Sequence, residues 1–171
     1  DGENFLPLAS SRDHKRLLEN DRGPNTGGMG AVSPAGALLT DRLNEIILDK
    51  VVSPTLSGLK KEGIVFKGFL YTGLMISDKG DPYVLEFNCR LGDPETQPIL
   101  LRLKSSFLEL IECSLNQKLD QYYPEWDTKV SVGTVIASAG YPSKPFKKQA
   151  IGQLPPNKTD LHIFHAGTKQ E

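Results

Sequence analysis

The stretch that decides the fold runs from Asp81 to Gln97 and reads Asp-Pro-Tyr-Val-Leu-Glu-Phe-Asn-Cys-Arg-Leu-Gly-Asp-Pro-Glu-Thr-Gln. Its first half predicts a β-strand, because side chains in this region alternate between two faces. One face carries Tyr83, Leu85 and Phe87, and the other carries Val84, Glu86 and Asn88. Residues two apart on a strand have Cα atoms roughly 6.6 Å apart. Glu86 and Asn88 are therefore expected to project side by side.

Glu86 and Asn88 together predict a site for a hard cation. A carboxylate oxygen and a carboxamide oxygen placed side by side can reach one Mg²⁺, or two ions bridged by phosphates. Oxygen ligands without His or Cys suit a cation that keeps its waters and takes further ligands from a nucleotide. The ordinary alternative is that this pair forms a solvated strand edge.

The residues that follow this strand add a cation and a helix start. Arg90 offers a planar, permanently charged fork that suits phosphate or carboxylate. Asp93, Pro94 and Glu95 predict the beginning of a helix, with Asp93 as the N-cap and Pro94 at the first helical position. Two oxygen ligands, an arginine and an anion-tolerant helix N-terminus thus fall within one short run, which favours a functional site.

The run from Glu86 to Gln97 resembles the metal-binding segment of the glycinamide ribonucleotide synthetases, or phosphoribosylamine–glycine ligases, which are ATP-grasp enzymes. Four other segments match the same family in the same order and are spread over nearly the whole chain. They are Asp13–Arg16, Gly23–Gly30, Gly68–Met75 and His165–Thr168.

The resemblance implies an ATP-dependent ligase of purine biosynthesis. Glycine would be activated as glycyl phosphate and captured by the amine of 5-phosphoribosylamine. Glu86 and Asn88 would hold Mg²⁺ or Mn²⁺ at the ATP phosphates, and Arg90 would hold the transferred phosphate or the acyl phosphate. Asp93 would face the glycine ammonium or would only cap its helix. The substrate side would be lined by Lys15, Arg16, Asn25, Thr26, Gly27 and Gly28.

The residues alone, without the family resemblance, predict a long loop over the polar segment from Ser10 to Pro34. Loops of this length are usually functional or disordered. Its glycine cluster, Gly23–Gly30, allows successive N–H groups to turn inward on an anion, and a merely flexible loop is the alternative. It is not a dinucleotide-binding fingerprint, because no strand closely precedes it and Ser33-Pro34 follows where a helix should open.

The predicted fold class is α+β: an ATP-grasp half with an antiparallel sheet and packed helices, plus a smaller β-rich C-terminal subdomain. Residues 1–120 are assigned to the C-terminal part of the ATP-grasp domain, and residues 121–171 to the start of an incomplete subdomain. A helical stretch from Thr40 to Gly63 should be interrupted at Pro54. The other expected elements are strands at Asn4–Ala9, Phe66–Ile76 (buried, with a hairpin loop at Ser77–Asp81), Lys129–Ala139 and Leu161–His165, and helices at Thr96–Leu103 and Phe107–Leu115.

Composition excludes several classes of protein. The 171 residues are 38% hydrophobic, which suits one domain or a domain and a half. A net charge of −1 and a pI near 6.4 argue against a nucleic-acid or anionic membrane surface. Cys89 and Cys113 are too few for a disulfide scaffold and indicate reduced thiols of a cytoplasmic protein. No apolar run approaches the ~18 residues of a membrane span.

The chain begins with Asp1-Gly2, and the family's amino-terminal domain, ATP lid and nucleotide-gripping lysines have no counterpart in it. We therefore expect the C-terminal portion of the enzyme, inactive without the missing N-terminal part. The alternatives are another ATP-grasp carboxylate–amine ligase and a non-catalytic fragment that binds metal or nucleotide weakly. A Mg²⁺-dependent phosphatase is disfavoured, since such sites usually need more carboxylates than Glu86 supplies.

Overall fold

The computed structural model describes residues 1–156 and 158–170, and it divides into two compact units, Asp1–Ile136 and Ala137–Glu171. Within the described part of the chain, every helix is too short or too polar to cross a membrane. The residues of the predicted site, from Lys15 to Asp93, all belong to the first unit.

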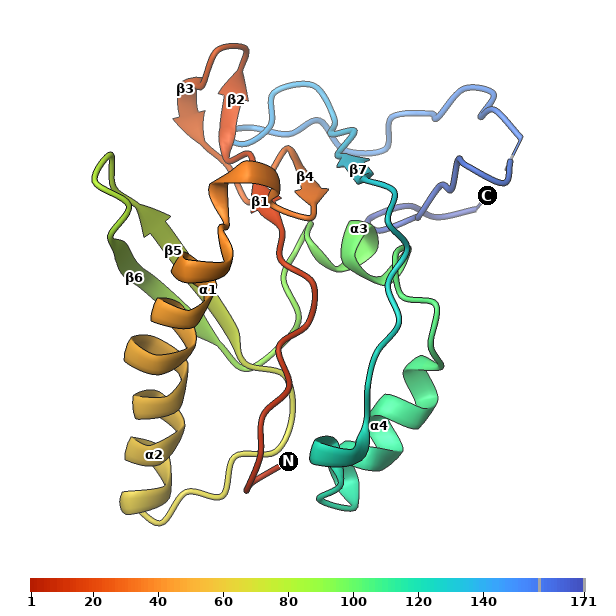
Figure 1. Ribbon diagram of the computed structural model, residues 1–171. Coiled ribbons are helices and arrows are strands. Elements are labelled where there is room, and N and C mark those ends of the chain that lie inside the picture. The colour runs from red at the N-terminus through yellow and green to blue at the C-terminus, as the bar shows by residue number, and fades with distance from the viewer. Residues whose placement is uncertain (157, 171) are drawn as a thin grey trace. The chain divides into compact units, whose positions relative to one another are not determined.

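A three-stranded antiparallel sheet of the first unit joins segments that lie far apart in sequence (Figure 1). Its strands are β1 (Arg12–Asp13), the central β4 (Gly30–Ser33) and β7 (Ser131–Thr134). A Cβ atom at Gly30 would collide with the carbonyl oxygen of Gly133, so the close approach of β4 to β7 requires glycine there. The predicted strand over Lys129–Ala139 is confirmed only in the four residues of β7.

The segment expected to be a loop, Ser10–Pro34, instead contains four short strands, so that prediction is wrong. Besides β1 and β4 it forms a hairpin of β2 (Arg16–Leu18) and β3 (Arg22–Asn25). Asn20 and Asp21, in the loop between Leu18 and Arg22, have φ of 57° and 55°, a left-handed backbone that is common in tight hairpin loops. The hairpin is largely exposed, so it lacks the apolar alternation by which a half-buried strand is recognised.

The predicted helical stretch after residue 40 is confirmed, and its interruption lies just before Pro54 rather than at it. Helix α1 (Asp41–Ile47) is capped by Thr40, whose Oγ1 accepts a hydrogen bond from Leu43 N at 3.2 Å. A π-helical stretch, η2 (Leu48–Val52), leads into α2 (Ser53–Lys61), which has a proline in its first turn. Gly63, with φ of 75°, ends the helix as expected.

The predicted hairpin around Ser77–Asp81 is also confirmed: β5 (Tyr71–Ile76) pairs antiparallel with β6 (Pro82–Asn88). Strand β5 begins later than expected, and Gly73 is its one buried residue, so the prediction of a buried strand over Phe66–Ile76 is wrong. The register passes from Gly73 opposite Glu86 to Leu74 opposite Val84, so a bulge interrupts the alternation of side chains predicted for β6. The two strands β5 and β6 form a ribbon, several of whose large apolar side chains are exposed: Met75, Tyr83, Val84, Leu85 and Phe87.

Two helices follow the ribbon. Helix α3 (Thr96–Leu100) is shorter than predicted, whereas α4 (Phe107–Leu115) has the predicted bounds and is capped by Ser106. Leu110 of α4 packs with Leu119 of η3 (Leu119–Gln121) and with Tyr122 to form a small core cluster. Another short 3₁₀ turn, η1 (Gly36–Leu38), precedes α1.

Two predicted terminal strands are absent from the described residues. Residues 4–9 are not paired as a strand; they line a large cavity instead. In the second unit, Leu161 makes only an isolated bridge with Lys158, so no strand covers Leu161–His165. The turn expected at residues 140–142 is present there, closed by a hydrogen bond from Lys144 N to Gly140 O at 2.8 Å.

A buried arginine links elements of the first unit that are distant in sequence. Arg102 is only 8% exposed. Its guanidinium donates to Lys129 O at 3.0 Å, to Asp127 O at 3.0 Å and to Ser33 Oγ at 3.1 Å. It thereby joins the chain after α3 to β4 and to the segment before β7.

Candidate functional site

A small cavity of about 50 Å³ lies where the end of β6 meets the turn after β1. Its lining includes six of the residues that the sequence predicted for the site, together with Tyr71 and Glu95, which it did not. The lining residues are Lys15, Gly27, Tyr71, Glu86, Asn88, Arg90, Asp93 and Glu95. Residues expected to act together from separate segments are thus brought to one place.

The predicted juxtaposition of Glu86 and Asn88 is confirmed by the strand register. Glu86 lies opposite Gly73 and Asn88 lies opposite Tyr71, so both share the ribbon face that carries the tyrosine. The Glu86 side chain is 49% exposed and so remains open to a ligand. Among the described residues there is no group of three or more His, Cys, Asp or Glu that could hold a metal. The donors present fit a hard cation that completes its shell with water or substrate oxygens.

Lys15 lies between two carboxylates. Its Nζ is 3.4 Å from Asp13 Oδ2 and 3.9 Å from Glu86 Oε1. The backbone holds it there, because its neighbour His14 donates to Gly30 O at 2.9 Å and Lys15 O accepts from Thr26 N at 2.7 Å. Lys15, which was predicted on the substrate side, therefore lies next to Glu86 of the predicted metal-binding pair.

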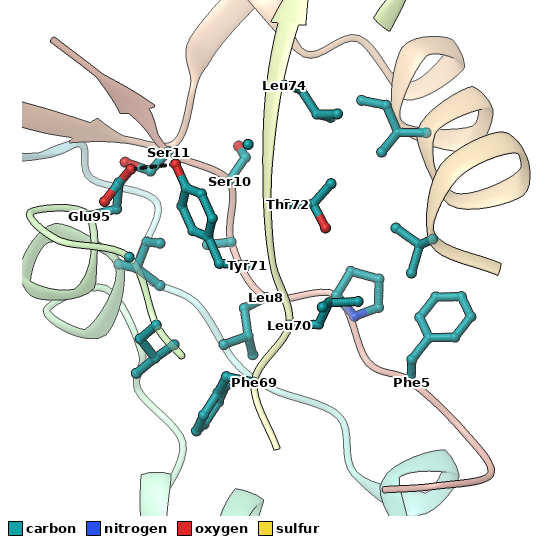
Figure 2. A pocket seen from close by; sticks show the side chains of 18 of the residues that line it. Phe5, Leu8, Ser10, Ser11, Phe69, Leu70, Tyr71, Thr72, Leu74 and Glu95 are labelled. Atoms are coloured by element: carbon teal, nitrogen blue, oxygen red, sulfur yellow. Dashed lines mark hydrogen bonds between the residues drawn. The ribbon is translucent and has the colours of Figure 1, made fainter. Parts of the chain in front are cut away.

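The half-buried Tyr71 and the buried Glu95 form a hydrogen-bonded pair that lines this small cavity, and Figure 2 shows the bond between them. Glu95 is 4% exposed, and Tyr71 Oη donates to its Oε1 at 2.8 Å. Burial, followed by the hydrogen bond and the charge of Glu95, raises the pKa of the Tyr71 hydroxyl far above its usual value. Tyr71 consequently stays protonated and remains a donor. The helix-start pattern led to a predicted role for Asp93 and gave no indication that Glu95 would bond Tyr71 at this cavity.

Four buried side-chain oxygens, one of them on Glu95 itself, have no hydrogen-bond partner within the part of the chain that the structure describes. Among the described residues they are both carboxylate oxygens of Asp13, Oε2 of Glu95 and Oε1 of Gln97. Burial and the nearby charge of Glu95 raise the pKa of Asp13, and Lys15 opposes that rise. Such oxygens are costly unless a donor reaches them, so each calls for an explanation.

Two glycines make room for these carboxylates. A Cβ atom at Gly92 would collide with Glu95 Oε2, and one at Gly28 would collide with Pro94 and lie 3.0 Å from Asp13 Oδ1. Gly28 also has φ of 131°, which residues with a side chain rarely adopt. The glycine at this turn thus serves close packing against the carboxylates.

Other predicted substrate-side residues hold the hairpin and its turn. Arg16 Nη1 donates to Gly23 O at 2.8 Å, and Arg16 pairs with Asn25 in the register of β2 and β3. Thr26 Oγ1 donates to Lys15 O at 2.8 Å and accepts from Gly28 N at 3.0 Å.

The prediction that Asp93 is the helix N-cap is wrong. Helix α3 begins at Thr96, whose N–H donates to Gly92 O at 3.2 Å, and Glu95 occupies the cap position without a side-chain cap bond. Asp93 instead is exposed at the small cavity. Arg90 is also exposed there, and its Nη1 donates to Leu91 O at 2.8 Å.

A second, much larger cavity of about 1220 Å³ lies among the N-terminal segment, α1, α2, β5 and α4. Figure 2 shows apolar side chains such as Phe5, Leu8 and Leu70 facing it, along with polar side chains such as Ser10 and Thr72. Phe69 at its edge stacks on Phe107 with ring centroids 5.9 Å apart.

The raised pKa of Asp13 predicts a pH-dependent stability gain for Asp13→Asn. The unfolded chain loses this proton first as pH rises, so the carboxylate lowers stability from its ordinary pKa of 3.8 upward, and the penalty persists above the folded-state pKa. Urea unfolding should therefore show Asp13→Asn to be more stable than the parent at about pH 7, with the gain vanishing below 3.8.

Asp127 provides a control of opposite sign. A hydrogen bond from Lys129 N lowers the pKa of its carboxyl, so its contribution is present at neutral pH and is lost on acidification. Asp127→Asn should lower stability at neutral pH. A loss of stability in Asp13→Asn at neutral pH would contradict the account given for Asp13.

The antiparallel sheets and packed helices make this an α+β protein, and the family model that matches its first 96 residues is of the ATP-grasp class. The chain belongs to the family described as "Phosphoribosylglycinamide synthetase, ATP-grasp (A) domain", which matches residues 1–96.

Named relatives agree with this assignment. The chain is 50% identical over 170 residues to "Phosphoribosylamine--glycine ligase" of Yersinia pestis, covering 99% of this chain and 40% of the relative. It is 50% identical over 169 residues to the protein of that name from Pseudomonas aeruginosa, covering 98% and 39%. The crystal structure of the Thermotoga maritima protein of that name aligns with TM-score 0.72 and 40% identity, covering 85% of this chain and 36% of that one. The chain thus spans about 40% of the length of these curated relatives.

Proposed function

We propose that this chain forms the metal-bearing wall of an ATP-dependent ligase that joins glycine to 5-phosphoribosylamine through glycyl phosphate. The observation that carries the proposal is the small cavity at which Glu86 and Asn88 meet Lys15 and Arg90. The names of the relatives support the choice of substrates.

The proposed roles follow from charge and reach. Glu86 and Asn88 would hold Mg²⁺ or Mn²⁺, which when bound neutralises phosphate charge. Arg90 would orient the acyl phosphate, and Lys15 would contact the substrate. Asp93, which does not cap the helix, would face the ammonium group of glycine. Phosphorylation of a carboxylate depends mainly on positioning and on fixed charges of this kind.

The domain boundary near residue 121 also remains a proposal: residues 1–120 as the end of the ATP-grasp domain, and residues 121–171 as the start of a C-terminal subdomain. We further propose that an N-terminal part of the same polypeptide covers the exposed ribbon and fills the larger cavity. The exposed apolar side chains of β6, including Leu85 and Phe87, support this view. A cytoplasmic location, with no nucleic-acid or membrane partner, completes the proposal.

The decisive test is glycine-dependent release of ADP by the complete polypeptide, with and without 5-phosphoribosylamine. Release with another carboxylate and not with glycine would favour a different ATP-grasp ligase. Failure of the complete polypeptide to release ADP with any small carboxylate would favour a binding protein without catalysis.

The 171-residue chain by itself should bind ATP·Mg with a dissociation constant in the millimolar range or weaker. In the proposed enzyme the nucleotide is held between this chain and the N-terminal part of the polypeptide, so this chain alone lacks the donors of that other part. Each lost charge-assisted hydrogen bond costs roughly 1.5–3 kcal/mol of binding free energy. Calorimetric titration measures this affinity. Micromolar binding by these residues alone would place the phosphate and adenine contacts within them. It would refute the proposal that the N-terminal part of the polypeptide supplies those contacts.

A further inference from the structure

We propose that the ammonium group of Lys15 competes with the divalent cation for Glu86 and thereby sets the affinity of this site for free metal. The inference rests on the proposed function and deepens it, because it adds a control of metal binding to the pair formed by Glu86 and Asn88. Three observations carry it: the ion pair between Lys15 and Glu86, the fixed backbone of Lys15, and a second carboxylate, Asp13, within reach of the same ammonium.

Lys15 shares a carboxylate with the proposed metal. Its Nζ lies 3.9 Å from Glu86 Oε1, and both residues line the small cavity. Two cations drawn to one carboxylate repel each other, so the lysine lowers the affinity of Glu86 for a metal ion. Arg90, the other cation at this cavity, donates to Leu91 O and makes no ion pair with Glu86 among the described residues. Lys15 is therefore the cation that is placed to compete.

The backbone of Lys15 is held in place, whereas its side chain extends toward solvent. Lys15 O accepts two hydrogen bonds from Thr26, one from its N at 2.7 Å and one from its Oγ1 at 2.8 Å. The Lys15 side chain is 45% exposed and that of Glu86 is 49% exposed. Long ion pairs between exposed groups are weak. The ammonium can thus move away from Glu86 without any change in the backbone that carries it.

Asp13 gives the displaced ammonium a second partner. Its Oδ2 lies 3.4 Å from Lys15 Nζ, and its side chain is only 9% exposed. Strand β1 fixes its position, because Asp13 pairs with Ala31 of β4. A carboxylate with so little access to water is costly without a cation beside it, so Asp13 draws Lys15 away from Glu86. Asp13 thereby limits how strongly the lysine competes with the metal.

The test is the affinity of the complete polypeptide for Mn²⁺ without nucleotide, measured by the loss of the paramagnetic resonance signal of free Mn²⁺. Lys15→Met removes the ammonium and keeps most of the side-chain length, so Mn²⁺ should bind about 3- to 10-fold more tightly. Lys15→Arg keeps the charge and should stay within about twofold of the parent. A merely structural role for Lys15 predicts weaker or unchanged binding in Lys15→Met.

The matched control is Lys79→Met, in the exposed turn of the ribbon and outside the lining of the small cavity. It makes the same change in net charge and should alter the Mn²⁺ affinity by less than about twofold, because solvent and salt screen a distant charge.

Asp13→Asn tests the second partner of the ammonium. It removes a negative charge and also releases Lys15 toward Glu86, so Mn²⁺ binding should weaken about 3- to 10-fold. In the Lys15→Met background only the first effect remains, and the loss should be smaller than about threefold. Equal losses in the two backgrounds would show that Asp13 does not hold Lys15 away from Glu86 and would overturn that part of the inference.

The outcomes separate this inference from the proposed function. Glu86→Gln should weaken Mn²⁺ binding by about 10-fold or more. If it does not, the proposed metal pair fails and takes this inference with it. If it does, and a folded Lys15→Met protein binds Mn²⁺ no more tightly than the parent, competition by Lys15 is refuted while the proposed function stands.

Two further results guard this conclusion. Equal tightening in Lys79→Met and Lys15→Met would also refute competition, because the effect would then come from net charge alone. Lys15→Gln, which is neutral and polar, repeats the measurement if the melting curve shows that Lys15→Met does not fold, and it should tighten Mn²⁺ binding in the same way.

Discussion

Glu86→Gln should lower glycine-dependent ADP release by the complete polypeptide by about two to three orders of magnitude, while its melting temperature changes by less than about 3 °C. Activity should fall because glutamine is a neutral and weaker ligand for a hard cation. Stability should be preserved because the side chain is 49% exposed and its ion pair with Lys15 is long, at 3.9 Å. Exposed ion pairs contribute about 0–1 kcal/mol.

The control for this variant is Glu109→Gln, which makes the same chemical change on the exposed surface of α4. A ligand role also predicts that raising the Mg²⁺ concentration restores part of the activity of Glu86→Gln. Turnover near that of the parent enzyme at every Mg²⁺ concentration, with an unchanged Mg²⁺ dependence, would show that Glu86 is not a metal ligand.

Arg102→Leu should destabilise the chain by about 2–4 kcal/mol, the largest stability effect we expect. The guanidinium is 8% exposed and donates to two carbonyl groups and to Ser33 Oγ. Leucine fills part of the space but removes the donor from these three buried or partly buried acceptors, and each loss is costly. The urea concentration at the unfolding midpoint, with the slope of the transition, measures the change.

Two variants sharpen this experiment. Arg102→Lys keeps the charge but loses the fork that reaches three acceptors, so its stability should lie between those of the parent and of Arg102→Leu. Arg42→Leu, on the exposed surface of α1, should change stability by less than about 0.5 kcal/mol. A loss below about 1 kcal/mol in Arg102→Leu would show that water satisfies these acceptors.

Features with local causes were predictable from the order of residues alone. Thr40 and Ser106 cap helices because an N-cap hydroxyl reaches a backbone N–H three residues ahead. Glu86 and Asn88 share a face because the strand period is two, and the bulge in β6 lies before this pair rather than within it. For the same reason the cation-binding pair can be proposed from the amino-acid sequence without its tertiary contacts.

The extent of the strands could not be predicted in this way. The hairpin of β2 and β3 is exposed, so its residues show no apolar alternation. The N-terminal segment looks like a strand by composition, yet it lines a cavity and pairs with none of the strands in the described part of the chain. Pairing depends on what lies beside a segment, and an isolated sequence window does not contain that information.

The tertiary structure alone decided which charged groups meet. Tyr71 and Glu95 are 24 residues apart, and Arg102 and Ser33 are 69 apart, so no periodicity connects them. The helix-cap pattern pointed to Asp93, yet folding buried Glu95 and left Asp93 exposed. The cost of burying a charge depends on every donor that the fold brings near it. The local sequence thus specified the cation-binding pair, whereas long-range packing brought Asp13 and Glu95 to its side.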